Sequence, residues 1–124
     1  MTSEEKIFLV DDEKVVRLSL KRELQNKNYS VEDFESAKDA LSLVSEDWQG
    51  VLVSDVMMPK MNGLTLMEKV REVDPEIPVI LITGQGNIPM AVQAIQNGAY
   101  DFLEKPFSTD AFMDAVKRAV EKRR

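Results

Sequence analysis

Four runs of apolar residues along this chain each lead to a polar side chain. The runs and the polar residues that follow them are Ile7–Val10 with Asp11 and Asp12, Val51–Val53 with Asp55, Val79–Ile82 with Thr83, and Phe102–Leu103 with Lys105. Continuous apolar runs are typical of strands that are buried on both faces, as in a parallel sheet covered by helices. Ligands of open parallel sheets bind outside the carboxyl ends of the strands. We therefore expect three carboxylates, a hydroxyl and an ammonium group to meet at one edge of the sheet.

Segments with helical periodicity lie between the predicted strands. Apolar residues spaced four apart predict a helix over about 14–27, with polar side chains including Arg17 on its other faces. A strand is predicted over 29–34, followed by a helix marked by Ala37, Ala40, Leu41 and Val44. A further helix carries Leu66, Val70 and Val73 and ends before Pro75. The next helix is capped by Asn87 and ends at Gly98, and its inward residues are Ala91, Ala94 and Ile95. The last helix is capped by Ser108, and its inward residues are Phe112, Ala115, Val116, Ala119 and Val120. Strands that alternate with helices predict an α/β fold, here with five strands and five helices.

Length and charge narrow the class of protein. With 124 residues, 44% of them hydrophobic, the chain fits a single domain, and only residues from about 118 to 124 resemble the start of a linker. The net charge of −6 opposes direct binding to nucleic acid or to an anionic membrane, because the field of the protein repels polyanions. No run approaches the ~20 apolar residues that cross a bilayer. The acidic start is unlike a secretory signal, so we expect a cytoplasmic protein.

The chain contains no histidine and no cysteine. It therefore lacks the commonest general base, the imidazole that carries phosphoryl groups, and thiolate metal ligands. Three aspartates at one sheet edge repel one another unless a cation lies among them, and their oxygen ligands favour a hard ion such as Mg²⁺. Three negative charges and the positive charge of Lys105 leave a formal charge of −2, which one divalent ion neutralises.

Each of these residues alone has an ordinary structural explanation. Asp11 and Asp12 suit the N-terminus of a helix, where the dipole favours anions, and Asp55 suits a turn. Thr83 and Lys105 are common residue types at strand ends and on surfaces. It is improbable that four separate strand ends lead to mutually compatible groups by chance, so the combination favours a functional site.

These residues resemble the motifs of the receiver domains of bacterial two-component response regulators. The similar segments are Leu9–Glu13, Ser54–Gly63, Ile82–Gly84 and Glu104–Phe107, within a resemblance that runs from about Lys6 to Lys122. The segment Thr83–Phe102 is most similar to the subgroup that precedes sigma-54 activator modules, particularly the C4-dicarboxylate transport regulators. The resemblance implies a flavodoxin-like (βα)5 doubly wound sandwich with five parallel strands in the order 2-1-3-4-5.

The resemblance also implies a reaction. Asp55 would accept a phosphoryl group, while Mg²⁺ and Lys105 neutralise the charge that develops on the equatorial oxygens. Asp12, Asp55 and the backbone carbonyl of Met57 would bind Mg²⁺, or Mn²⁺ in its place, and Asp11 would act through bound water. Without a histidine of its own, the chain would take phosphate from a sensor histidine kinase or a small donor such as acetyl phosphate. Separately, Met57 and Gln85 flank the approach of water and are candidates for setting the phosphate lifetime.

A switch is the output that the resemblance implies. The Thr83 hydroxyl would move toward the phosphate and Phe102 would fill the space left, unless Phe102 is a fixed core residue. The fourth helix, fifth strand and fifth helix would then change homodimerisation and control an output module outside this chain, of the AAA+ sigma-54 activator type. The Lys105–Pro106 bond is a candidate for the cis form, which in the family aims the lysine inward. Such a domain phosphorylates and slowly dephosphorylates itself, without a separate substrate.

Two other functions use similar parts. A phosphatase of the haloacid-dehalogenase type also has a strand-end aspartate and Mg²⁺, but it expects an acid two residues after the nucleophile, where this chain has Met57. A pseudo-receiver or nucleotide-binding scaffold would have lost acidic or lysine positions and would have a glycine-rich first loop. Here all the acids are present, and Asp11-Asp12-Glu13 leaves no phosphate cradle.

Overall fold

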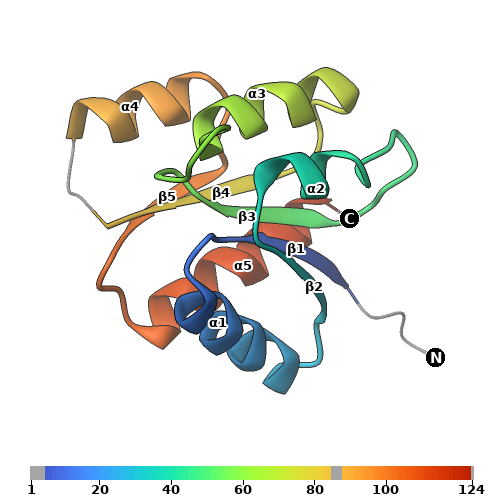
Figure 1. Ribbon diagram of the computed structural model, residues 1–124. Coiled ribbons are helices and arrows are strands. Elements are labelled where there is room, and N and C mark those ends of the chain that lie inside the picture. Colours follow the sequence, from blue (N-terminus) through green and yellow to red (C-terminus); the bar gives the residue numbers. More distant parts are fainter. Residues whose placement is uncertain (1–4, 85–87, 124) are drawn as a thin grey trace.

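Five parallel strands form a single sheet between two layers of helices (Figure 1). The computed structural model describes residues 5–84 and 88–123. The strands are β1 (Lys6–Val10), β2 (Ser30–Phe34), β3 (Val51–Asp55), β4 (Val79–Thr83) and β5 (Asp101–Glu104), and the helices are α1 (Lys14–Asn26), α2 (Ala37–Leu41), α3 (Gly63–Val73), α4 (Ile88–Gln96) and α5 (Thr109–Arg123). The strand order is β2-β1-β3-β4-β5, so the predicted flavodoxin-like α/β fold and its order 2-1-3-4-5 are confirmed.

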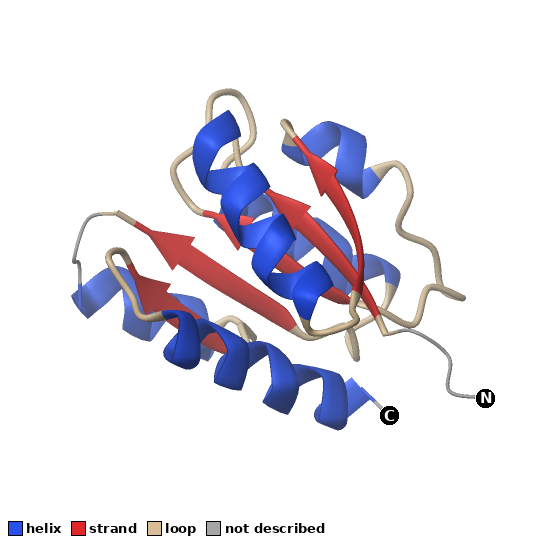
Figure 2. Cartoon of the chain, turned by 90° about the horizontal axis from the view of Figure 1, so that it is seen from below, coloured by secondary structure: helices blue, strands red, loops and turns tan. Residues whose placement is uncertain are grey.

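Alternate residues of each central strand face opposite layers of helices. Phe8 and Val10 of β1 belong to the cluster beneath α2, α3 and α4, whereas Ile7 and Leu9 belong to the cluster against α1 and α5. Figure 2, seen from below, shows α1 and α5 across that second face of the sheet. Because both faces are covered, β3 and β4 are buried at every position, which explains their unbroken apolar runs.

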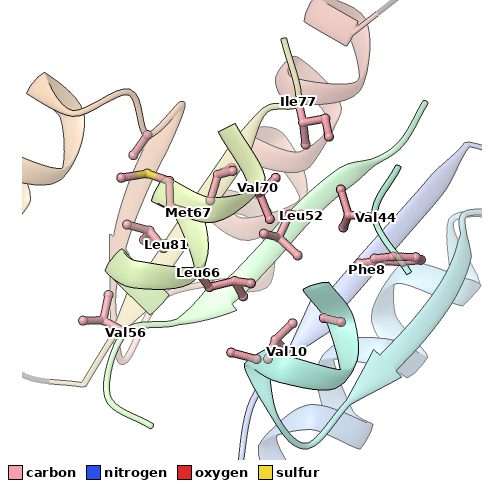
Figure 3. Packing of buried hydrophobic residues seen from close by; sticks show 14 of the residues in the cluster. Phe8, Val10, Val44, Leu52, Val56, Leu66, Met67, Val70, Ile77 and Leu81 are labelled. Atoms are coloured by element: carbon pink, nitrogen blue, oxygen red, sulfur yellow. The ribbon is translucent and has the colours of Figure 1, made fainter. Parts of the chain in front are cut away.

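The larger of the two clusters fixes the position of β1 and β3 (Figure 3). Leu52 of β3 and Leu81 of β4 pack with Leu66, Met67 and Val70 of α3. At the other end of this cluster the rings of Phe8 and Trp48 lie 4.2 Å apart, and those of Phe8 and Phe34 lie 5.0 Å apart in an edge-on arrangement. This packing holds the strand ends that carry the polar residues.

Several predicted element ends are confirmed. Gly98 ends α4 with a φ of +112°, in the left-handed region that glycine favours. The Ser108 Oγ accepts a hydrogen bond of 3.0 Å from the Ala111 N–H and so caps α5, whose five predicted inward residues are all buried. Asn87, predicted to cap α4, lies outside the described residues. Within the described ranges, no helix combines the length and the apolar character needed to cross a membrane.

Two side chains lie on faces opposite to those predicted. Arg17 was expected on an exposed face of α1, but it is only 8% exposed because Asp33 on β2 pairs with it. Ile95 was expected to face the core, but it is 47% exposed. Ala94, one position earlier, is fully buried and takes the inward face of α4, which turns Ile95 by about 100° toward the outside.

The α-helical part of α2 is shorter than predicted. It ends at Leu41, and tighter turns continue to Val44, whose N–H donates to the Leu41 carbonyl at 3.1 Å. Helix α5 continues to Arg123, and the start of a linker at about residue 118 stays a prediction. Arg123 is fastened to the domain by Nη2, which lies 2.8 Å from Asp74 Oδ2 and 2.6 Å from the Trp48 carbonyl oxygen.

Candidate functional site

The carboxyl edge of the sheet brings the predicted residues together from four strands. Asp11 and Asp12 follow β1, Asp55 ends β3, Thr83 ends β4 and Lys105 follows β5. Parallel strands deliver their carboxyl ends to the same edge, which is why residues far apart in sequence become neighbours. Carboxylate oxygens of the three aspartates all lie within 4.8 Å of one another, so the expected acidic cluster is present.

Asp11 is the most constrained of the three acids. Its side chain is 1% exposed, its Oδ1 accepts a hydrogen bond of 2.9 Å from the Glu13 N–H, and its own N–H donates to the Phe34 carbonyl at 3.1 Å. Burial raises the pKa of Asp11, and the negative charge of Asp55 raises it further, although the Glu13 amide and Lys105 oppose the increase. Burial is thus the main reason why the charged form of Asp11 is disfavoured, and further positive charge beside the carboxyl group would stabilise that form.

Asp55 lies at the centre of the edge and is only 4% exposed. Its Oδ2 is 3.2 Å from the Lys105 Nζ, and its Oδ1 accepts a hydrogen bond of 3.2 Å from the Met57 N–H. Gly63 packs directly against the Asp55 backbone, since a Cβ at Gly63 would lie 3.0 Å from the Asp55 carbonyl carbon and closer still to its oxygen. The loop between β3 and α3 is thereby held close to Asp55.

Lys105 connects the acids on β1 and β3. Its Nζ lies 3.5 Å from Asp11 Oδ2, 3.2 Å from Asp55 Oδ2 and 3.8 Å from Glu13 Oε1. Burial lowers the pKa of Lys105, but the charges of Asp11 and Asp55 more than offset this and raise the pKa above its usual value, so the ammonium form is stabilised. The Lys105–Pro106 peptide bond is cis, and the Lys105 N–H donates to the Thr83 carbonyl at 2.7 Å.

Thr83 and Phe102 lie on neighbouring strands at the side of the acidic cluster. Thr83 ends β4, is 1% exposed and is paired in register with Glu104 of β5. Phe102 is half-buried against the larger hydrophobic cluster, the one beneath α2, α3 and α4. It also lines a cavity of about 380 Å³ between α4 and β5. The two are therefore brought to one side of the site, but a half-buried ring suits either a mobile or a fixed Phe102.

The remaining predicted residues lie at the rim or outside the described part of the chain. Met57 is 56% exposed beside Asp55, and Asp12 is more accessible than Asp11 or Asp55. Gln85, the second candidate for setting a phosphate lifetime, lies outside the described residues.

Arg17 is a residue of the site's surroundings that the sequence pattern did not identify. Its Nη1 donates a hydrogen bond of 2.8 Å to the Asp11 carbonyl, and its Nε donates one of 2.8 Å to Asp33 Oδ2. A signal was present, because Arg17 precedes Leu20 by three residues and Leu24 by seven, the spacing of the buried face of a helix.

The donor set fits a hard divalent cation. Among the residues that the structure describes, three carboxylates converge here, and the Lys105 ammonium group pairs with two of them, those of Asp11 and Asp55. Magnesium is held in proteins by one or two carboxylates together with water and phosphate oxygens, and Asp12, which is more accessible than Asp11 and Asp55, leaves room for such ligands. The site therefore has the chemistry of a magnesium site.

Residues 7–117, which include every residue of this cluster, match the response regulator receiver domain. The chain belongs to this family. Receiver domains are signalling domains that use Mg²⁺, and response regulators pair with histidine kinases. This receiver domain resembles the C4-dicarboxylate transport transcriptional regulatory protein DctD of Rhizobium meliloti (strain 1021), with 46% identity over 124 residues. The match covers 100% of this chain but only 27% of that regulator's length.

Solved structures support the same assignment. The crystal structure of FixJ-N has a TM-score of 0.88 with this receiver domain and 39% identity, covering 97% of this chain and 96% of the other. The solution structure of the beryllofluoride-activated NtrC4 receiver domain dimer has a TM-score of 0.89 and 36% identity, covering 96% and 98%. The resemblance to receiver domains is therefore confirmed in sequence and in fold.

Proposed function

We propose that this receiver domain accepts a phosphoryl group on Asp55 in a Mg²⁺-dependent reaction. The observation that carries the proposal is the convergence of three carboxylates within 4.8 Å, with the Lys105 Nζ 3.2 Å from Asp55 Oδ2. Asp55 ends the central strand β3, and it is the residue that the resemblance to receiver domains implies as the acceptor. Asp12 is more accessible than Asp11 and suits metal binding.

The side chains suggest how the transfer would proceed. A carboxylate oxygen of Asp55 attacks phosphorus in line, the new O–P bond forms as the bond to the donor breaks, and the donor leaves with the electron pair. Lys105 holds a fixed positive charge beside the attacking group and stabilises the oxygens of the transferring phosphoryl group. Asp12, Asp55 and the Met57 carbonyl would bind Mg²⁺, with Asp11 acting through water, and the ion would supply the remaining positive charge.

The phosphate would come from outside the chain. These 124 residues contain no histidine, so a phosphohistidine donor would lie outside them, and a sensor histidine kinase is the donor that the family implies. Small donors such as acetyl phosphate would substitute for it. Water would later hydrolyse the acyl phosphate, and the exposed Met57 at the rim, together with Gln85, would set how quickly this happens.

The output would be a change in the surface formed by α4, β5 and α5. Thr83 would bind the new phosphoryl oxygens, and Phe102 would repack in the cavity beside α4. A dimer of a similar receiver domain makes homodimerisation the proposed readout. The similarity to DctD supports a transcriptional output module, of the AAA+ sigma-54 activator type, in a cytoplasmic regulator whose receiver domain does not itself bind nucleic acid.

The two other functions fit the site less well. A haloacid-dehalogenase type of phosphatase needs an acid at position 57, where an exposed methionine lies. A pseudo-receiver would not need such a cluster, yet the three acids lie within ligand distance of one another and Lys105 pairs with Asp11 and Asp55.

Acetyl phosphate with Mg²⁺ tests the proposal. We expect one phosphoryl group per chain, located on Asp55 by peptide mass spectrometry, and no modification of Asp55→Asn. Asp47→Asn, which changes an exposed aspartate away from the site, is the matched control and should react as the wild type does. Modification at another residue, or equal reaction of Asp55→Asn, would contradict the assignment.

A further inference from the structure

Asp33, at the edge of the sheet, pairs with two cations of α1. Arg17 Nε lies 2.8 Å from Asp33 Oδ2, and Lys21 Nζ lies 2.7 Å from Asp33 Oδ1. The Arg17 side chain is 10% exposed and that of Asp33 is 18% exposed, so this is not a solvent-facing ion pair. None of the three residues contributes a side chain to the acidic cluster.

Arg17 nevertheless touches the backbone of that cluster. Its Nη1 donates a buried hydrogen bond of 2.8 Å to the Asp11 carbonyl, while the Asp11 N–H donates to Phe34 next to Asp33 on β2. Both peptide groups that flank Asp11 are thus hydrogen-bonded toward β2, one to Phe34 directly and the other to Arg17, which pairs with Asp33. The Asp11 carbonyl belongs to the peptide that leads into Asp12, so its orientation sets the direction from which Asp12 leaves the strand.

We propose that Arg17 is a positioning residue for the magnesium site, anchored by Asp33 and holding the peptide between Asp11 and Asp12. The inference rests on the proposed function, since it assigns a role toward the ion that Asp12 and Asp55 would bind. A guanidinium group suits this role because its rigid fork makes two hydrogen bonds in different directions, which a lysine ammonium on a flexible stem does not reproduce. Residues that orient metal ligands typically alter metal affinity by 10–100-fold when they are changed.

Charge and geometry predict opposite effects of removing Arg17. If Arg17 acted only as a positive charge near the acids, Arg17→Gln would make the site more negative and would strengthen Mg²⁺ binding. If Arg17 holds the peptide, the same variant weakens Mg²⁺ binding in spite of the more negative site. Arg17→Lys keeps the charge and loses the fork, so it isolates the geometric effect.

Arg123 provides a matched control at a distance from the site. Its guanidinium also joins an aspartate, Asp74, to a backbone carbonyl, that of Trp48, and its side chain is 9% exposed. Arg123→Lys and Arg123→Gln therefore remove an equivalent buried bridge without touching the loop after β1.

The experiment is a calorimetric Mg²⁺ titration of the wild-type domain and these variants, with far-UV circular dichroism at the same temperature to show that each is folded. We expect Arg17→Lys and Arg17→Gln to bind Mg²⁺ at least about 10-fold more weakly, and the Arg123 variants to bind within about two-fold of the wild type. In the metal-free protein, amide hydrogen exchange at Asp12 and Glu13 should accelerate in the Arg17 variants alone.

Contrary results separate the possible failures. Tighter binding by Arg17→Gln, or unchanged binding by folded Arg17→Lys, would overturn the positioning role and leave the proposed function intact. Equal weakening by the Arg17 and Arg123 variants would show a general loss of stability instead. If the Arg17 variants do not fold, Asp33→Asn removes the anchor and keeps the guanidinium, and it must weaken Mg²⁺ binding for the inference to stand. A wild-type domain that takes up no Mg²⁺ would overturn both proposals.

Discussion

Gly63→Ala is the substitution whose effect follows most directly from the structure. A Cβ at this position would lie 3.0 Å from the Asp55 carbonyl carbon and from Val56 Cα, and closer than that to the Asp55 carbonyl oxygen. All three neighbours are backbone atoms, so no side-chain rotation relieves the contact. The loop between β3 and α3 must move until the separation approaches the ordinary range of 3.4–4 Å.

The expected cost combines two opposing effects. Overpacking of this kind typically costs about 1–3 kcal/mol. Alanine in place of glycine in a helix returns up to about 1 kcal/mol, and Gly63 begins α3. We therefore expect Gly63→Ala to lower the free energy of unfolding by about 1–2 kcal/mol, which for a domain of this size lowers Tm by roughly 3–8 °C.

The same movement should disturb the chemistry at Asp55. The loop carries the Met57 backbone, whose N–H bonds Asp55 Oδ1 at 3.2 Å and whose carbonyl is a proposed metal ligand. We expect phosphorylation by acetyl phosphate to slow by about 10-fold, the effect typical of disturbing a residue that orients metal ligands.

Urea denaturation and a phosphorylation time course measure both effects. The control is Gly84→Ala, because among the described residues, apart from its chain neighbours, the nearest atom to a Cβ there is Lys105 Cδ at 4.0 Å, an ordinary contact. A Gly63→Ala protein as stable and as reactive as Gly84→Ala would refute the argument that this glycine is required by the Asp55 backbone.

Three further predictions concern single side chains. Lys105→Gln should slow phosphorylation of Asp55 by about 10²-fold, measured with acetyl phosphate, since it removes the cation 3.2 Å from the carboxylate; an unchanged rate would contradict this. Burial raises the pKa of Asp33, but hydrogen bonds from its cationic partners outweigh this and lower the pKa below 3.8. The ion pairs of Asp33 therefore stabilise the fold above pH 3.8, and this stabilisation is lost as the pH falls through the lowered pKa. Urea denaturation should thus find Asp33→Asn less stable than the wild type at pH 7, by an amount that shrinks below pH 3.8, and a constant difference would be inconsistent with this linkage. Thr83→Ala should still be phosphorylated while the Phe102 ring resonances no longer respond to beryllofluoride; an unaltered response would rule out the proposed relay.

The strands and the carboxyl edge were predictable because their physical cause is local. Val79–Thr83 is apolar throughout, and burial on both faces leaves no other arrangement for such a short run. Once the strands are parallel, their carboxyl ends must share an edge, so Asp55 and Lys105 are placed at the same edge. The strand order and the long lysine side chain then bring the Lys105 Nζ across β4 to within 3.2 Å of Asp55 Oδ2. Gly98 and Ser108 end and begin helices through their own backbone and side-chain chemistry, which a sequence shows directly.

The helix faces were harder to predict because tertiary partners decide them. Arg17 is charged, and a charged residue is placed outside unless its partner is known, yet Asp33 makes its burial acceptable. Ile95 is apolar and was placed inside, but the inward face of α4 is already occupied by Ala94. The groove that results beside Phe102 depends on the packing of α4 against β5, which no periodicity in either segment contains.

Calorimetric titration of the wild-type domain with Mg²⁺ tests the central claim most directly. The account predicts saturable uptake of one ion per chain at millimolar concentrations, because three carboxylates lie within 4.8 Å of one another and the positive charge of Lys105 offsets only part of their negative charge. It also predicts that Asp12→Asn loses this uptake while remaining folded. A folded wild-type domain that takes up no Mg²⁺ at these concentrations would contradict the account.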